Sequence, residues 1–336
     1  MAARAEARGS SMLHNRARSF SGDDVVVCGG MVSGAYDASQ GSSKGLFLAQ
    51  VVGNESVCRE HWRCVLEVVG LGDALPGQFV QLLCADPSAD CWTSPAPLRR
   101  PFSIAGLRRE GKRCEVDILY RAIGSGTRWL ATRRPGDAVS IIGPLGQPFR
   151  LLDDRPVAYL VGGGVGLPPL IWLAQWLREA GKETVAFCGA RTADRLPLSR
   201  DRAGPIPPDK PALAFREFSA SATPVVLSTD DGSLGARGQI PDVFARYLER
   251  HGDRARPAVV YACGPEPMLQ AVARICSRRA LPCQVSLERM MACGMGTCQS
   301  CVVRLRGATA GDGWRYRLCC TDGPVFDASQ VLWEAG

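Results

Sequence analysis

The sequence predicts a multidomain β plus α/β fold, in which an antiparallel barrel precedes a parallel-sheet domain and a small cysteine-rich domain. Short strands separated by glycine and proline turns fill residues 45–150, which is typical of a small barrel. Strands then alternate with helices, which indicates βαβ units. Cysteines crowd the C-terminal part. We expect a poorly ordered extension over 1–44 and domains over 45–152, 153–283 and 284–336.

Composition excludes several classes of function. The net charge is +7, from 40 basic and 33 acidic residues, but the basic residues come as scattered pairs such as Arg133-Arg134. This pattern predicts no nucleic-acid partner. Fifteen cysteines occur, and no segment near the N-terminus has the apolar core of a secretory signal. We therefore expect a cytoplasmic protein whose reduced thiols are metal ligands or buried side chains.

The barrel segment carries two candidate binding motifs beside its strands, which we expect near 46–52, 62–69, 79–84, 114–120 and 138–142. In Arg100-Pro101-Phe102-Ser103 an arginine and a short hydroxyl stand on one strand, where they can hold a phosphate. The second motif offers an aromatic platform, a cation and a glycine-rich turn. Each residue also fits a plain role as an exposed strand charge or a loop glycine. The second motif consists of Leu119, Tyr120, Arg121, Gly126 and Thr127.

Residues 156–177 contain no charge and are long enough to cross a bilayer. Glycines and the pair Pro168-Pro169 interrupt the run, so we predict a buried strand, a glycine turn and a core helix, and no membrane span. Such a turn presents free amides at a helix N-terminus, which suits a pyrophosphate. The spacing is G-x-G-x-G rather than the Rossmann pattern and, taken alone, also fits an ordinary tight turn. The glycines are Gly162, Gly163, Gly164 and Gly166.

Cys263-Gly264-Pro265 follows an apolar strand predicted at 258–263. A thiol at the carboxyl end of a parallel strand faces the crevice where ligands bind, which makes Cys263 a candidate catalytic residue. A buried structural cysteine is the alternative. Arg191 and Arg195 follow the second strand of this domain, where a cation can meet the 2′-phosphate of NADP. The three histidines cluster with nothing in the sequence, and we assign them no role.

The C-terminal cysteines have a diagnostic spacing. Cys293, Cys298 and Cys301 follow the C-x(4)-C-x(2)-C pattern of plant-type [2Fe–2S] sites, with Cys319-Cys320 further on as the source of a fourth ligand. Glycines at 294 and 296 allow the backbone to pass close to a cluster. Four cysteines also suit zinc, but zinc sites usually repeat their C-x(2–4)-C knuckle and no second knuckle exists here. The spacing favours the iron–sulfur cluster.

These motifs resemble those of a known family. The order R-P-x-S, G-x-G-x-G-x-x-P and C-G-P is similar to the ferredoxin–NAD(P) reductase superfamily. Residues 286–301 and the stretch Cys320-Thr-Asp-Gly-Pro-Val-Phe resemble the electron-transfer subunit of type B dihydroorotate dehydrogenase. The resemblance covers residue 45 to the C-terminus. It implies that Arg100–Ser103 and the second barrel motif hold FAD, that the glycine turn with Gly264 and Pro265 frames NAD, and that Cys320 is the fourth cluster ligand.

The resemblance also implies a division of labour. A flavin exchanges two electrons at once with a nicotinamide, whereas a [2Fe–2S] cluster carries one. Nothing in the chain resembles an FMN site or a base for dihydroorotate, so a partner must supply that chemistry. In the family the partner is an FMN-containing catalytic subunit, two of each subunit form a heterotetramer, and electrons run from dihydroorotate to NAD in pyrimidine (UMP) biosynthesis.

Two alternatives remain at this point. A reductase subunit of a hydrogenase, a sulfide dehydrogenase or a transhydrogenase-like complex has the same barrel and nucleotide domain, often with a C-terminal cluster. A zinc-bound interaction module with a vestigial nucleotide fold belongs to a different class, and the absence of flavin and iron in the purified protein would identify it.

Overall fold

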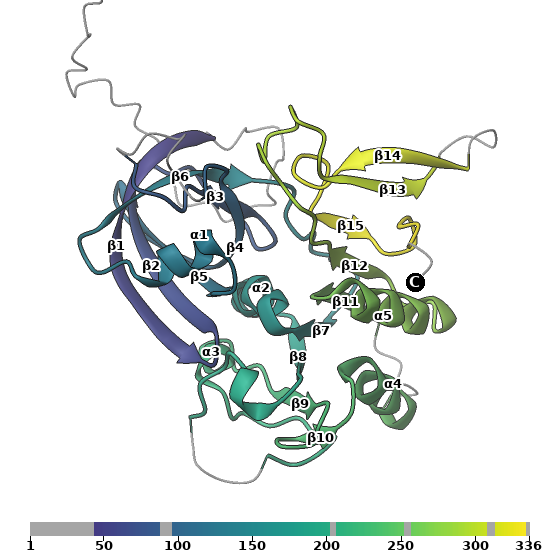
Figure 1. Cartoon of the computed structure of the whole chain (residues 1–336). Helices are drawn as coiled ribbons and strands as arrows, with labels where there is room; N and C mark the ends of the chain where they lie inside the picture. The colour runs from purple at the N-terminus through teal and green to yellow at the C-terminus, as the bar shows by residue number, and fades with distance from the viewer. Residues whose placement is uncertain (1–43, 88–95, 202–205, 252–256, 308–312, 334–336) are drawn as a thin grey trace, which may run out of the picture. The chain divides into compact units, whose positions relative to one another are not determined.

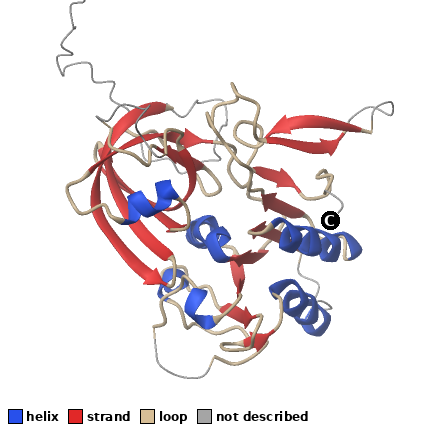
Figure 2. Ribbon diagram, viewed as in Figure 1, coloured by secondary structure: helices blue, strands red, loops and turns tan. Residues whose placement is uncertain are grey.

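The computed structural model describes residues 44–87, 96–201, 206–251, 257–307 and 313–333 (Figure 1). The extension predicted at 1–44 lies outside these ranges, apart from Lys44. Strands dominate the first hundred described residues and helices enter mainly after residue 160 (Figure 2). This order agrees with the predicted change from barrel to α/β pattern.

Six strands close into an antiparallel barrel in the order β1-β2-β5-β4-β3-β6. Alternate residues of each strand point into its core: Val80 and Leu82 of β3 do so, whereas Phe79 belongs to the core of the neighbouring sheet. The barrel prediction is therefore confirmed. The strands are β1 (Gly45–Cys58), β2 (His61–Val69), β3 (Phe79–Leu82), β4 (Arg100–Glu110), β5 (Arg113–Arg121) and β6 (Ala138–Leu145), with α1 (Ser125–Ala131) after β5.

The second sheet has seven strands in the order β10-β9-β8-β7-β11-β12-β15, all pairs parallel except β12 with β15. Helices α2 (Leu167–Glu179) and α3 (Arg216–Ser219) share one core with the sheet, and α4 (Ile240–His251) and α5 (Glu266–Arg278) share the other. The remaining elements are β7 (Val157–Gly163), η1 (Gly164–Gly166), β8 (Glu183–Ala190), η2 (Ala193–Arg195), β9 (Val225–Thr229), β10 (Ala236–Arg237), β11 (Ala258–Cys263), β12 (Cys283–Ser286) and β15 (Val325–Asp327).

The uncharged run at 156–177 forms β7, η1 and most of α2, as the glycine and proline pattern predicts. Most of its apolar side chains are buried in the core that α2 shares with the sheet, and Val161 is buried in the core on the other face. Among the helices that the structure describes, none combines the length and the apolar character needed to cross a membrane.

The cysteine-rich segment leaves the second sheet and returns to it. After β12 the chain forms a loop, a two-stranded sheet of β13 (Val302–Arg306) and β14 (Trp314–Leu318), and then β15, which pairs with β12 (Figure 1). The boundary predicted at 283/284 thus falls inside β12. Cys301 and Val303 lie in the same core cluster as Phe79 of the barrel. A segment this short has too few apolar side chains for a core of its own.

Candidate functional site

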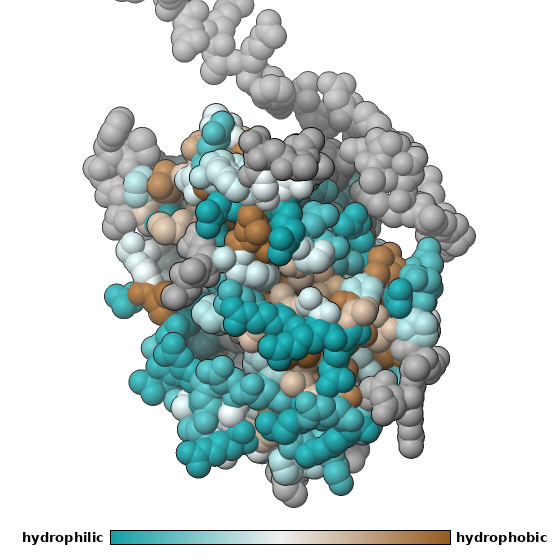
Figure 3. All heavy atoms as spheres, turned by 90° about the vertical axis from the view of Figure 1, so that its right-hand side faces the viewer, coloured by the Kyte–Doolittle hydropathy of each residue, from teal (hydrophilic) through white to brown (hydrophobic). Residues whose placement is uncertain are grey.

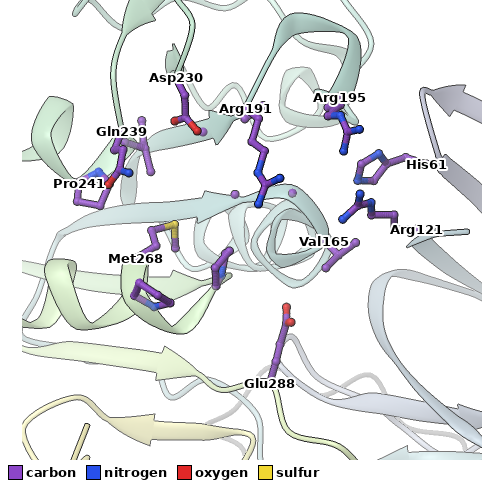
Figure 4. A pocket seen from close by; sticks show the side chains of 17 residues that line it. His61, Arg121, Val165, Arg191, Arg195, Asp230, Gln239, Pro241, Met268 and Glu288 are labelled. Carbon is purple, nitrogen blue, oxygen red and sulfur yellow. The ribbon is translucent and has the colours of Figure 1, made fainter. Parts of the chain in front are cut away.

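A cavity of about 450 Å³ opens where β7, β8, β9 and β11 of the second sheet end (Figure 4). Its wall includes His61 and Arg121 from the barrel, the turn after β7, the first residues of α4 and the turn before α5. Carboxyl ends of parallel strands are where open α/β sheets bind ligands. The geometry therefore makes this cavity the candidate nucleotide site.

The predicted glycines divide into two groups. Gly163 and Gly164 line the cavity, and Gly164 has a φ of +56°, a conformation that favours glycine. Gly162 and Gly166 instead pack tightly behind it. A Cβ on Gly166 would stand 2.2 Å from the carbonyl oxygen of Cys263, and one on Gly162 would stand 2.6 Å from a methyl carbon of Leu170. The first pair leaves the turn open to a ligand, and the second permits its close packing.

The three residues of the Cys263-Gly264-Pro265 turn differ in their relation to the cavity. Pro265 lines the cavity, and Gly264 adopts a φ of +150° beside it. Cys263 is buried in the core that faces α2 and is absent from the cavity wall. Burial, followed by the nearby carboxylate of Glu288, raises the pKa of its thiol well above the usual value, so the thiol stays protonated. A catalytic role for Cys263 thus remains a prediction that this geometry does not support.

Three arginines line the cavity, and they differ in whether a carboxylate neutralises their charge. The guanidinium groups of Arg121 and Arg195 both contact Oε2 of Glu60, at 2.6 and 3.3 Å. Arg191 extends toward the cavity (Figure 4) and pairs with no carboxylate among the described residues. Asp230 stands on the same wall. This wall therefore offers an entering nucleotide the guanidinium of Arg191, unneutralised by any described carboxylate, and the carboxylate of Asp230.

Two residues of the wall had no predicted role. His61 begins β2 directly opposite Arg121 in the strand register, and burial lowers the pKa of its imidazole. Glu288 points into the cavity from the chain that leads to the cysteines (Figure 4), and partial burial raises the pKa of its carboxyl although the residue stays exposed. His61 belongs to no local motif, and Glu288 lies in the stretch 286–301 without a role of its own there. Only the pairing of β2 with β5 and the neighbouring position of β12 bring them to the cavity.

The predicted flavin motif begins β4. Arg100 donates to the carbonyl oxygens of Leu98 and Arg99, and it forms no ion pair with another residue that the structure describes. Phe102 points into the barrel, and Ser103 pairs with Phe79 in the register of β3 and β4. Pro101 sits opposite Gln81. A half-buried guanidinium that two carbonyl oxygens hold in place, with no described carboxylate to neutralise it, suits a phosphate contact.

The second barrel motif needs one correction. Tyr120 is only 2% exposed, its ring packs edge-on against Phe102 at 5.8 Å, and its hydroxyl donates to Asn54. Its side chain is a core residue and offers no aromatic platform, because alternation along β5 turns it inward. Leu119 and Arg121 occupy the opposite face of the strand.

The glycine-rich turn of this motif is built for a tight bend. Thr127 Oγ1 accepts hydrogen bonds from the amides of Ile123 and Gly124, both at 3.1 Å, which fixes the start of α1. Gly126 is buried, and a Cβ there would stand 3.0 Å from Cβ of Cys84. The turn is therefore rigid.

The four cluster cysteines come together in two pairs. The amide of Cys298 donates to the sulfur of Cys293 at 3.4 Å, and the amide of Cys320 donates to the sulfur of Cys301 at 3.4 Å. Hydrogen bonding from Ser300, 3.2 Å away, lowers the pKa of Cys298 to about 6, so this thiol is largely a thiolate at neutral pH. Thiolates are the form that binds iron.

Cys319 and Cys320 play different parts. The thiol of Cys319 is fully buried and donates to the carbonyl oxygen of Leu287 at 3.2 Å. Cys320 lies beside Cys301 and follows the end of β14. The structure thus pairs Cys320 with Cys301, whereas the thiol of Cys319 is bonded to the backbone at Leu287, ahead of the segment that carries Cys293, Cys298 and Cys301.

The cysteine loop suits a binuclear cluster. Within the described ranges no three or more His, Cys, Asp or Glu side chains form a group that could hold a metal ion, so the four cysteines stand as two separate pairs. Two pairs of thiols are what two irons require, since each iron takes two protein ligands. Gly294 and Gly296 have φ values of +73° and +92°, conformations open to glycine, as a loop wrapped closely around a cluster needs.

The comparisons with known proteins agree with this geometry. Residues 288–332 match the iron–sulfur cluster binding domain of dihydroorotate dehydrogenase B. The structure is similar to an NADH-dependent reduced ferredoxin–NADP oxidoreductase, with a TM-score of 0.67 and 25% identity over 85% of this chain and 90% of the other. The Amycolatopsis cytochrome P450 reductase, 22% identical over 71% of this chain and 67% of its own, shares the fold with a TM-score of 0.54.

Fold and site together define an electron-transferring oxidoreductase of the ferredoxin–NADP reductase type with an iron–sulfur binding domain. The electron transfer subunit of dihydroorotate dehydrogenase B (NAD(+)) from Shouchella clausii is 36% identical over 84% of this chain and 96% of its own length. That from Geobacillus kaustophilus is 39% identical over 76% and 86%. The chain belongs to this family of electron transfer subunits. The predicted resemblance is confirmed, and the hydrogenase-type alternative is not favoured.

Proposed function

We propose that the chain passes electrons between the FMN of a dihydroorotate dehydrogenase catalytic subunit and NAD, through a [2Fe–2S] cluster and FAD. One observation carries the proposal: the turn after Cys320 is hydrogen-bonded to the end of the barrel. Gln147, which follows β6, donates from its amide to Gly323 at 2.6 Å and from its side chain to the carbonyl of Thr321 at 2.9 Å. Thr321 follows Cys320 directly, so the barrel and the cluster ligands share one packed unit.

Each cofactor has its own residues in this proposal. Arg100 and Ser103, with the rigid turn at 124–127, hold FAD on the barrel. The turn at 162–166 and Pro265 hold the nucleotide in the cavity. When bound, FAD supplies the change between the electron pair that a nicotinamide carries and the single electron that the cluster carries. The cluster ligands are Cys293, Cys298, Cys301 and Cys320.

The nucleotide is proposed to be NAD. Arg191 can meet a phosphate, but Asp230 lines the same wall and Arg195 is already paired with Glu60. A carboxylate near the adenosine ribose accepts hydrogen bonds from its hydroxyls and repels a 2′-phosphate. The relatives carry NAD(+) in their names.

The catalytic subunit is proposed to dock at the exposed side of the cysteine loop. Met290 is 89% exposed and Met295 is 51% exposed, and the cluster ligand Cys298 is exposed as well. Large exposed apolar side chains of this kind are typical of protein interfaces. On the face that bears α4, α5 and the two-stranded sheet, apolar atoms form separate patches among polar ones (Figure 3). A heterotetramer with two copies of each subunit completes the proposal.

Reconstitution from separate subunits tests the proposal. The isolated chain should bind FAD and reduce artificial acceptors with NADH, and it should leave dihydroorotate untouched. Adding the FMN-containing partner should create dihydroorotate-dependent NAD reduction. Cys298→Ser should block the coupled reaction and spare NADH oxidation by acceptors that draw electrons from the flavin. Cys58→Ser is the matched control, because this half-buried cysteine ends β1 and belongs to no cluster ligand pair.

Two outcomes contradict the specific assignment. One is dihydroorotate oxidation by this chain alone. The other is recovery of a hydrogenase subunit, in place of an FMN-containing dihydroorotate oxidase, as the partner bound in cells. The second outcome would leave the role as a flavin and iron–sulfur electron carrier standing.

A further inference from the structure

Gln81 is a buried polar side chain without a hydrogen-bond partner. It stands in the middle of β3, is 0% exposed, and neither its Nε2 nor its Oε1 contacts a donor or acceptor in the described part of the chain. Buried carboxamides are almost always hydrogen-bonded, because leaving them unpaired carries the full cost of removing them from water. An orphaned amide of this kind indicates a bound group that satisfies it.

The side chain points out of the barrel toward the cysteine loop. Its neighbours Val80 and Leu82 fill the barrel core, so alternation along β3 turns Gln81 to the opposite face with Phe79. Phe79 packs in the same cluster as Cys301 and Cys320. Gln81 therefore faces the iron–sulfur domain from the flavin-binding barrel.

The closest neighbour is the residue after the first cluster ligand. A Cβ on Gly294 would stand 2.6 Å from both Nε2 and Cγ of Gln81, so only glycine fits against this amide. Across the ladder, Gln81 lies opposite Pro101, next to Arg100 at the head of the flavin motif. One carboxamide thus touches the cluster loop and stands on a strand paired with the flavin-binding strand.

We propose that Gln81 is a positioning residue for the cluster: its amide N–H donates to cluster sulfur and fixes the cysteine loop against the barrel. The inference rests on the proposed function, because it takes the [2Fe–2S] cluster as the group that satisfies the amide. Thiolate and sulfide sulfurs are acceptors, and donors to them stabilise the reduced cluster, which carries one more negative charge. Gln81 then makes the cluster easier to reduce.

The experiment measures the cluster in the isolated full-length holoprotein, without the partner subunit. Gln81→Leu and Gln81→Met remove the amide and keep most of its volume. Both should shift the midpoint potential of the cluster to a more negative value. The expected shift corresponds to an equilibrium constant for cluster reduction that is about tenfold smaller, as for the loss of one hydrogen bond to a charged group. They should also change the electron paramagnetic resonance signal of the reduced cluster and leave the FAD potential unchanged.

Gln78→Leu is the matched control. Gln78 is a second buried carboxamide of the barrel, but it is already bonded to Gly146 and Leu75 within the protein. Its loss should lower the melting temperature without changing the potential or the resonance signal. Loss of the cluster with FAD retained in both Gln81 variants also supports the proposal.

Three results overturn the proposal. The first is an unchanged cluster potential and signal in both Gln81 variants. The second is a shift confined to the FAD potential, which would make the flavin the partner of the amide. The third is joint loss of FAD and cluster with a lowered melting temperature, which would show a purely structural role. A wild-type chain that purifies without iron would instead refute the proposed function itself, so the two failures are distinguishable.

Discussion

The thiol of Cys319 donates to the carbonyl oxygen of Leu287 at 3.2 Å, whereas the adjacent Cys320 has its amide on the sulfur of Cys301. We therefore expect Cys320→Ser to abolish the visible absorbance of the cluster and to lower the iron content. Cys319→Ser keeps a hydroxyl donor for Leu287 and should leave both nearly intact. Absorbance spectra and iron analysis of the two purified variants check this, and reversed phenotypes would show that the fourth ligand is Cys319.

Arg100 carries a charge that no described carboxylate neutralises. Arg100→Ala should weaken FAD binding by roughly 10- to 100-fold, as expected for the loss of one hydrogen bond to a charged group. The melting temperature of the apoprotein should hardly change, because the side chain contributes little packing. Arg108→Ala on the same strand removes only an exposed ion pair with Glu115 and serves as control. Retention of stoichiometric FAD by the Arg100 variant through gel filtration would contradict the assignment.

Glu60 of the barrel pairs with Arg121 of the same barrel and with Arg195 of the nucleotide domain. The hydrogen bond from Arg121 holds the pKa of its carboxyl below the ordinary value of 4.5. Because the folded pKa is the lower one, the stabilisation is present above pH 4.5 and is lost as the pH falls through the folded pKa. Glu60→Gln should therefore melt below the wild type at neutral pH.

The gap between the two melting temperatures decides this prediction. It should stay constant from pH 8 to pH 6 and close as the pH falls below about 4.5. Thermal melting curves across that range provide the measurement. A difference in melting temperature that grows toward acid pH would contradict the prediction, because it would mean that folding does not lower the pKa of Glu60.

Two glycines of one turn should respond differently to substitution. A Cβ on Gly166 would meet the backbone oxygen of Cys263 at 2.2 Å, so Gly166→Ala should destabilise the nucleotide domain by at least about 2 kcal/mol. Gly164 has open space around it and a φ of +56°, which asparagine tolerates. Gly164→Asn should fold normally and raise the KM for NADH, because its side chain enters the cavity.

Melting temperatures and steady-state kinetics with an artificial acceptor separate the two effects. Equal loss of stability in both variants would mean that the turn is held only by packing. An unchanged KM in the Gly164 variant would remove the turn from the nucleotide site.

Local patterns in the sequence predicted most of the architecture. Short apolar segments between glycine and proline turns located the barrel strands, and the glycines and prolines within 156–177 separated β7 from α2. Spacing alone identified Cys293, Cys298 and Cys301, because a loop that wraps around a cluster must place its ligands within a few residues of each other. The choice of Cys320 depended on the family resemblance, and the hydrogen bond of Cys319 to Leu287 supplies its physical basis.

What could not be predicted depends on contacts between distant segments. His61 reaches the cavity from a barrel strand, and Glu288 reaches it from the segment that follows β12. Tyr120 was expected at a ligand, but only the register of β5 shows that its ring faces the core. The three residues of β15 are too few for a periodic signal, so their place in the seven-stranded sheet came only from the fold.

That strand has a consequence for synthesis and handling of the protein. All four residues of β12 are buried, and Val325–Asp327 pair with Gln284–Ser286 on its outer side. Until the chain has passed through the cysteine loop and come back, β12 is an uncharged edge strand with free amides and carbonyls, the kind of surface on which copies of a protein aggregate. Iron supply and solubility are therefore linked: a culture short of iron should yield inclusion bodies, together with soluble protein that lacks the cluster absorbance.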